Sequence, residues 1–212
     1  MLEFNLDMTQ ELENLKLPAP ELVSYYTDIQ RRIIWLDSEV NESTLSITKQ
    51  ILQWNIEDAG IPKEQRRPIK LFIDSPGGDV TSGLALIDVI MTSETEVWTI
   101  TVGKAYSMAF LIALAAERDR RVGFANGSFL LHDGNQYMAN STSKFRDYMD
   151  FNQQTEDRIR EFVVSRTDIT PEKYDEKLRH EWYFYSDEAR KLDVIQHIVG
   201  IGIFSLNELL SR

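Results

Sequence analysis

The chain has 212 residues and no cysteine, and its 34 acidic against 23 basic residues give a formal net charge of −11. This length fits one domain with a substantial core. The acidic balance argues against non-specific nucleic-acid binding, and the lack of cysteine excludes disulfides and a thiol nucleophile. No apolar run approaches the roughly 20 residues of a membrane span, and the acidic start MLEFNLDMTQELE is unlike a targeting peptide. We expect a soluble, cytoplasmic protein without membrane contact.

The first part of the chain predicts an alternation of strands and helices. Residues 1–24, which include an LPAP segment, should be extended or flexible and should precede a single domain over residues 25–212. Apolar runs and helical periodicity predict strands over 33–36 and 69–73 and helices over 43–56 and 81–91. Such an alternation is typical of an α/β fold.

Three apolar runs in the central block end at residues suited to a site. LFI is followed by DSPGG (74–78), WTITV by GKAYS (103–107), and FLL by His132. Ligands and chemistry in layered α/β folds collect at the carboxyl ends of strands. We therefore expect these three ends to converge on one site.

Ser107 lies where a strand turns into an expected helix. Its hydroxyl should be exposed there beside the unpaired N–H groups of the first helical turn, which places a nucleophile next to an oxyanion site. Histidine has the right pKa for the base, and His132 alone of the three histidines ends a strand of this block. The Gly77-Gly78 pair allows a substrate backbone to approach closely and offers a second N–H. Taken singly, such residues are more often a turn, a cap and a structural histidine.

In this order the motifs resemble the Clp protease proteolytic subunit family, serine peptidases of the ClpP/crotonase fold. The resemblance rests on SPGG (75–78), GKAYSM (103–108) and His132. The spacings, 30 residues from Gly77 to Ser107 and 25 from there to the histidine, fit the family without gaps. About three quarters of the chain is covered. The resemblance implies an α/β fold of repeated β-β-α units with a protruding handle helix, expected here over 144–165.

The resemblance implies a serine endopeptidase that hydrolyses peptide bonds of unfolded polypeptides. Ser107 would attack the carbonyl, and His132 would act as general base and then as acid. Glu181, 49 residues after the histidine, would orient the imidazole. The N–H groups of Gly78 and Met108 would hold the oxyanion. Neither a metal nor an organic cofactor is implied.

Glu181 departs from the aspartate that the family usually has as the triad acid. Glutamate fills this role in some hydrolases, and its extra methylene requires a backbone roughly 1.5 Å further away. Asp175 and Asp187 are nearby alternatives, and Glu181 is otherwise a solvated surface residue. We expect His180 beside it to be structural or exposed.

The resemblance further implies heptameric rings, two of which stack into a tetradecamer with internal active sites. A hexameric AAA+ unfoldase of the ClpX or ClpA kind would feed this chamber and consume ATP. The handle helix would pack against the opposing ring. The Pro and Gly residues that the family has after its histidine are replaced here by DGNQ (133–136), in a strand that aligns substrate and joins the rings.

Two other functions stay open. A catalytically impaired ring subunit with a structural role would keep the fold; Ser107 and His132 argue against it, whereas Glu181 does not. A crotonase-like acyl-CoA enzyme would hold a thioester enolate with two N–H groups and would need no serine–histidine pair. Reaction of Ser107 with a fluorophosphonate probe separates the peptidase from both.

Overall fold

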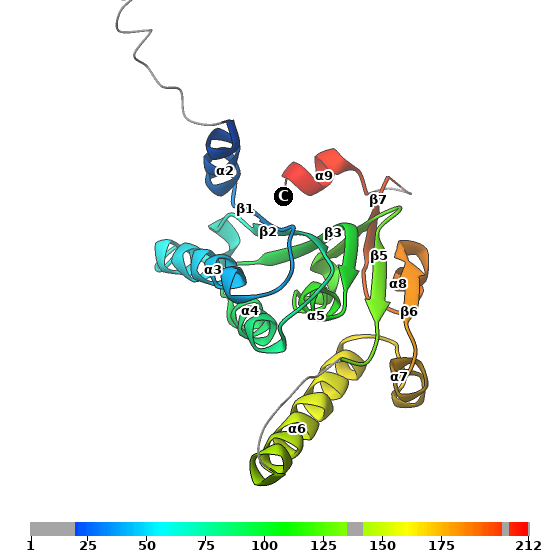
Figure 1. Ribbon diagram of the computed structural model, residues 1–212. Helices are drawn as coiled ribbons and strands as arrows, with labels where there is room; N and C mark the ends of the chain where they lie inside the picture. The colour runs from blue at the N-terminus through cyan, green and yellow to red at the C-terminus, as the bar shows by residue number, and fades with distance from the viewer. Residues whose placement is uncertain (1–19, 135–141, 201–203, 212) are drawn as a thin grey trace, which may run out of the picture.

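A mostly parallel sheet forms the centre of the protein, with helices on both of its faces (Figure 1). The computed structural model describes residues 20–134, 142–200 and 204–211. Within these ranges seven strands form one sheet: β1 Ile33–Leu36, β2 Ile69–Ser75, β3 Val97–Tyr106, β4 Arg121–Phe124, β5 Ser128–Leu131, β6 Trp182–Tyr185 and β7 His197–Val199.

Helices connect most of these strands. In chain order they are α2 Pro20–Gln30, α3 Leu45–Glu57, α4 Val80–Thr92, α5 Met108–Ala113, α6 Thr142–Arg166, α7 Pro171–Leu178, α8 Ser186–Lys191 and α9 Leu206–Ser211. The α/β class and the Clp type of fold that the sequence predicts are confirmed. The strands expected over 33–36 and 69–73 are β1 and β2, and the expected helices are α3, α4 and α6.

The sheet divides along its longest strand, β3. Its order is β1-β2-β3-β4-β7, with all of these neighbours parallel. The first half of β3 pairs with β4, and the second half, Lys104–Tyr106, pairs with β5. β6 then adds to β5 in the antiparallel direction. The division places the ends of β3, β5 and β6 side by side, and the candidate site is there.

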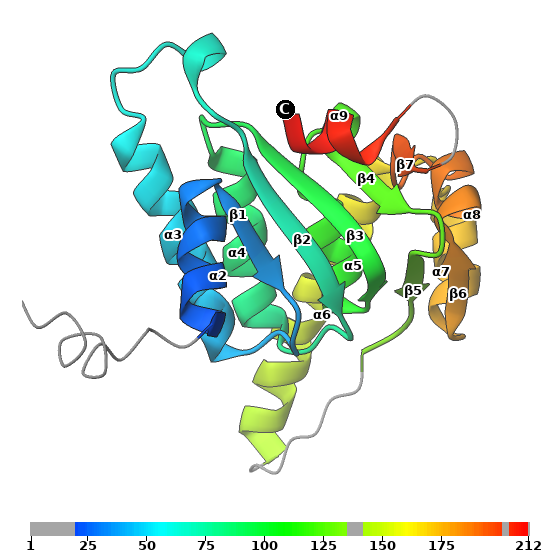
Figure 2. The ribbon, with the colours of Figure 1, turned by 90° about the horizontal axis from the view of Figure 1, so that it is seen from above.

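Two hydrophobic clusters hold the helices to the sheet. The larger one lies under α3, α4 and α5, and all six residues of α5 are buried. The smaller one lies on the opposite face under α9, where Trp98 of β3 stacks on Phe204. Figure 2 shows α2 and α9 on this second side of the sheet. Because α5 is enclosed by the larger cluster, the residue at its N-terminus has a fixed position.

The expectation of an extended or flexible segment over 1–24 is wrong for residues 20–24, which begin α2. Proline at the first position of a helix costs little, since its fixed φ suits the helix and its missing N–H would be unpaired there anyway. Glu21 adds a carboxylate at the positive end of the helix dipole. Residues 1–19 lie outside the described part of the chain.

Two arginines anchor the base of α6 to the end of α5. Arg121 is 1% exposed, and it donates through Nε to the carbonyl of Ala116 at 2.8 Å and through Nη1 to that of Arg166 at 2.7 Å. Arg166 in turn donates to Leu114, Ala115 and Ala116. Burial lowers the pKa of Arg121 to about 10, so the group is still cationic at neutral pH. Arg121 and Arg166 together therefore satisfy the carbonyls of residues 114–116, just after α5, and the last carbonyl of α6.

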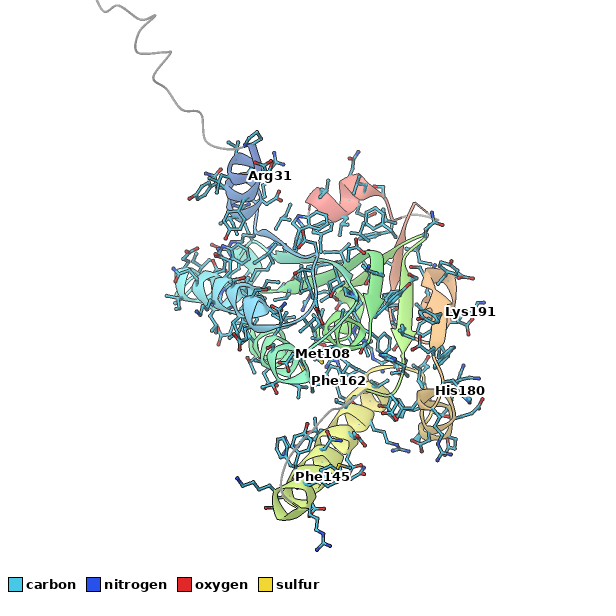
Figure 3. All side chains as sticks on the ribbon, viewed as in Figure 1. Arg31, Met108, Phe145, Phe162, His180 and Lys191 are labelled. Atoms are coloured by element: carbon cyan, nitrogen blue, oxygen red, sulfur yellow. The ribbon has the colours of Figure 1, made fainter. Side chains whose placement is uncertain are left out.

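The long helix α6 projects away from the sheet on the side of α4 and α5 (Figure 1). Figure 3 shows Phe162 near its sheet end and Phe145 near its far end. In the described parts of the chain, no helix combines the length and apolar character needed to cross a bilayer. Of the DGNQ segment (133–136), where the sequence is expected to depart from the family, residues 135 and 136 lie outside the described residues.

Candidate active site

Ser107 occupies a strained turn between β3 and α5. Its backbone has φ 53° and ψ −122°, a region that non-glycine residues rarely adopt. Such a sharp strand-to-helix turn holds a serine hydroxyl exposed at the end of a sheet. The strain is maintained from both sides, because α5 is buried and the N–H of Ser107 donates to the carbonyl of Leu130 in β5 at 2.9 Å.

Gly77 packs directly against this turn. A Cβ added to it would lie 2.4 Å from the carbonyl oxygen of Tyr106 and 2.8 Å from both Met108 N and Ser107 Cβ. The φ of Gly77 is +90°, so both the space and the conformation require glycine. The first and second strand ends therefore converge, as the sequence predicts.

The glycine turn is itself tied to the segment after β1. Ser75 is fully buried, and its hydroxyl donates to the carbonyl of Ser38 at 2.6 Å and accepts from the N–H of Gly77. Val40 donates to the carbonyl of Gly77 at 2.8 Å and accepts from the N–H of Asp79 at 2.7 Å. These bonds hold the glycine backbone in place before any substrate arrives.

Two N–H groups beside Ser107 are available to a ligand. Among the described residues, neither the N–H of Gly78 nor that of Met108 donates to a protein acceptor. The N–H of Met108 opens α5 and so has no partner within its own helix. Unpaired N–H groups that are fixed in place can hold an anion, such as an oxyanion that forms on a substrate.

His132 and Glu181 face each other across the β5–β6 ladder. The last pair in that ladder is Leu131 with Trp182, so the next residues outward are the histidine and the glutamate. The distance from His132 Nδ1 to Glu181 Oε1 is 3.3 Å, and the two side chains are 20% and 58% exposed. The contact uses Nδ1, which leaves Nε2 available to another group. Within the described ranges, no hydrogen bond joins the hydroxyl of Ser107 to His132; catalytic hydrogen bonds often tighten only in the substrate complex.

Tyr183 supplies a second partner for the carboxylate. Its hydroxyl donates to Glu181 Oε2 at 2.5 Å. This hydrogen bond is the main cause that holds the pKa of Glu181 below its usual range, and the contact with His132 acts in the same direction. Glu181 reciprocally raises the pKa of Tyr183. At neutral pH the pair is therefore an ionised carboxylate and a protonated phenol.

The other candidate acids lie elsewhere. Asp175 forms a two-pronged ion pair with Arg160, with both oxygens at 2.7 Å, and Asp187 belongs to the first turn of α8. His180 is exposed, as expected, and Figure 3 shows it beside α7. His197 contacts the carbonyl of Asp119. Of these carboxylates, the structure brings Glu181 alone to His132. Within the described ranges no three His, Asp or Glu side chains are grouped to hold a metal ion.

Sequence reasoning missed Tyr183 and Tyr106. The rings of these two tyrosines pack edge to face with centroids 5.5 Å apart. The alternating residues Tyr183 and Tyr185 in β6 point to one face of a strand. That alternation indicated where the side chain of Tyr183 lies, but it did not reveal which groups the hydroxyls of Tyr183 and Tyr106 contact.

A strained serine turn beside unpaired N–H groups is a feature of serine hydrolases as a class. Comparison with known proteins identifies the family: residues 21–201 match the sequence model of the Clp protease family. The chain belongs to the Clp protease family.

Curated relatives carry the name "ATP-dependent Clp protease proteolytic subunit". Subunit 2 of Treponema pallidum (strain Nichols) is 26% identical over 194 residues, which cover 91% of this chain and 94% of the relative. Subunit 3 of Parasynechococcus marenigrum (strain WH8102) is 31% identical and covers 87% and 92%. Subunit 2 of Tropheryma whipplei (strain Twist) is 28% identical over 171 residues, with 80% and 92% covered. These names support a peptidase.

Proposed function

We propose that the protein is a serine endopeptidase that cleaves unfolded polypeptides, with Ser107 as nucleophile, His132 as general base and Glu181 as the acid that orients it. The observation that carries the proposal is the conformation of Ser107, a strained non-glycine residue at the N-terminus of the buried helix α5. Its φ of 53° is costly and persists only where the surroundings impose it.

Hydrolysis would proceed in two halves. The oxygen of Ser107 attacks the peptide carbonyl, and its proton passes to Nε2 of His132. The imidazolium then gives that proton to the departing amine, and an acyl-enzyme is left. In the second half His132 removes a proton from water and the resulting hydroxide attacks the ester. The bond from the acyl carbon to the Ser107 oxygen then breaks, the carboxylic acid product leaves, and His132 returns the proton to the serine oxygen. Glu181 stabilises the imidazolium in both halves and does not itself become protonated.

The two unpaired N–H groups would stabilise the negative charge of each tetrahedral intermediate. The N–H groups of Gly78 and Met108 are fixed by the turn and by α5, so they need no rearrangement as the charge develops. Removing a single donor of this kind from a hydrolase typically slows the chemical step by about 10²–10³-fold. The packing of Gly77 against Ser107 sets the distance between this hole and the nucleophile.

We infer that the active site is enclosed in a closed chamber. Ser107 is partly exposed in the single chain, so an unassembled peptidase would act on any unfolded neighbour. The projecting helix α6 also exposes apolar side chains: Phe145 is 44%, Met149 46% and Phe151 64% exposed. Phe145 and Met149 are one turn apart on the same face of α6, whereas Phe151 lies on another face. Exposed apolar side chains that share a face are a feature of interaction surfaces. We propose heptameric rings that are stacked through α6 and served by an AAA+ unfoldase; the relatives' names support a subunit of an ATP-dependent protease.

The direct test is hydrolysis of a short unstructured peptide by the purified protein and by Ser107→Ala. The variant should retain the thermal unfolding midpoint of the parent, because only a hydroxyl is removed, and should lose cleavage. Equal cleavage by both proteins would refute the mechanism. A parent protein that folds and assembles but cleaves nothing would indicate the structural ring subunit instead.

A further inference from the structure

The contact with His132 alone does not fix the orientation of the Glu181 carboxylate. Its side chain is 58% exposed, and its contact with His132 is a single one at 3.3 Å. Exposed ion pairs contribute little to stability. Fixing a glutamate side chain also costs conformational entropy, because the side chain has several rotatable bonds. A triad acid must nevertheless keep one orientation, because it holds the imidazole tautomer. A second contact is needed to fix it.

Tyr183 provides that second contact through the other carboxylate oxygen. Oε1 faces His132 Nδ1, whereas Oε2 accepts the phenolic hydrogen at 2.5 Å. Glu181 and Tyr183 are two residues apart on either side of Trp182, so strand geometry puts both on the same face. A bond from a neutral donor to an ionised acceptor is among the stronger hydrogen bonds in proteins.

The ring of Tyr183 is held by a contact with β3, the strand that leads to Ser107. Tyr106, the residue before Ser107, packs edge to face against Tyr183 with an interplanar angle of 79°. The hydroxyl of Tyr106 lies 2.9 Å from that of Ser128, which donates to the carbonyl of Gly103. The ladders pair Tyr106 with Leu130, and Leu130 with Tyr183, so the two tyrosines lie in one row across β3, β5 and β6.

We propose that Tyr183 is a positioning residue, whose hydroxyl fixes the Glu181 carboxylate in the orientation that accepts the Nδ1 hydrogen of His132. Tyr106 supports the ring of Tyr183. The position of Glu181 therefore depends on β3, the strand that leads to Ser107. The inference rests on the proposed peptidase function, and it explains how an exposed glutamate can serve as a triad acid.

The test compares Tyr183→Phe with Tyr185→Phe. Both remove one hydroxyl from a half-exposed tyrosine of β6, since Tyr183 is 54% and Tyr185 63% exposed. For peptide hydrolysis we expect Tyr183→Phe to lower kcat about tenfold with KM unchanged, because a hydrogen bond to a charged group is lost at a partly solvated site. Tyr185→Phe should stay within about twofold of the parent. A general structural defect would instead lower the unfolding midpoint of Tyr183→Phe well below that of Tyr185→Phe.

A double-mutant cycle with Glu181→Gln assigns the effect to the carboxylate. The second-order rate constant for fluorophosphonate labelling of Ser107 is measured in the parent, Tyr183→Phe, Glu181→Gln and the double variant. If the tyrosine acts through the acid, its removal should slow labelling in the parent background and change it less than about twofold in the Glu181→Gln background. A loss of equal size in both backgrounds, or no loss in either, overturns the positioning role while the peptidase function stands. A parent protein that neither labels nor cleaves overturns both.

Discussion

Replacing Gly77 with alanine should disable the site through backbone crowding alone. The new Cβ would lie 2.4 Å from the carbonyl oxygen of Tyr106 and 2.8 Å from Met108 N. Both atoms belong to the backbone, so no side chain can rotate away to make room. The turn that carries Ser107 must move, or the glycine turn must move away from it.

The chain contains a matched control for the conformational part of this cost. Gly60 has φ +88° against +90° for Gly77, but a Cβ there would meet nothing within 4 Å. Gly60→Ala should therefore show only the strain of alanine at positive φ, about 1–2 kcal/mol. Gly77→Ala carries the same strain plus an overpacking cost of about 1–3 kcal/mol.

Urea unfolding of the two variants gives the stability difference, and the rate of fluorophosphonate labelling gives the reactivity of Ser107. We expect Gly77→Ala to be less stable than Gly60→Ala by at least about 1 kcal/mol. Its labelling should be about 100-fold slower than that of the parent, since displacements near 1 Å have effects of this size. Gly60→Ala should label at the parental rate. Equal stability of the two variants together with normal labelling of Gly77→Ala would show that the glycine turn does not set the geometry of the site.

Three further predictions follow from other contacts. Glu181→Gln should lower kcat by about 10⁴-fold and Asp175→Asn should leave it unchanged, as measured by peptide hydrolysis; the reverse result would show that Glu181 is the wrong acid. Asp58 is 2% exposed and its pKa is lowered from 3.8, chiefly by the hydrogen bond from Arg32, so Asp58→Asn should cost about 3 kcal/mol in urea unfolding at pH 7. That cost should shrink as the pH falls below 3.8, because the unfolded chain then takes up a proton on Asp58 that the folded parent binds only at a lower pH, so the parent loses this stabilisation; a cost that stays constant from pH 7 to pH 3 would contradict it. Light scattering should give a mass of at least seven times 24.6 kDa, and a stable monomer that cleaves peptides at full rate would refute the closed chamber.

The elements that could be predicted from the sequence are those whose pattern is local. The apolar run over 33–36 predicts a strand and forms β1, although only Ile34 and Leu36 are buried and Trp35 is exposed. The long periodic stretch over 144–165 similarly forms most of α6. At Pro20 the local indications of a helix were present, namely a proline at its first position and an acidic residue after it. They were outweighed by the extended preference of the LPAP segment, and the prediction for residues 20–24 was wrong.

The candidate site was predictable in its chemistry and less so in its geometry. The serine at a strand end and the histidine closing a later strand follow from residue order. The position of Glu181 depends on the register between β5 and β6, two segments about fifty residues apart in the chain, which no local pattern specifies. The bond from Tyr183 to that carboxylate depends on the same register, and so it became visible only in the structure.

The central claim is that Ser107 is an activated nucleophile, and covalent labelling tests it most directly. A fluorophosphonate probe should add one group per chain, and mass spectrometry of the digested protein should place it on Ser107. His132→Ala should slow the reaction by several orders of magnitude, because the serine then has no base. Labelling at another residue, or no labelling of a folded and assembled protein, would contradict the account.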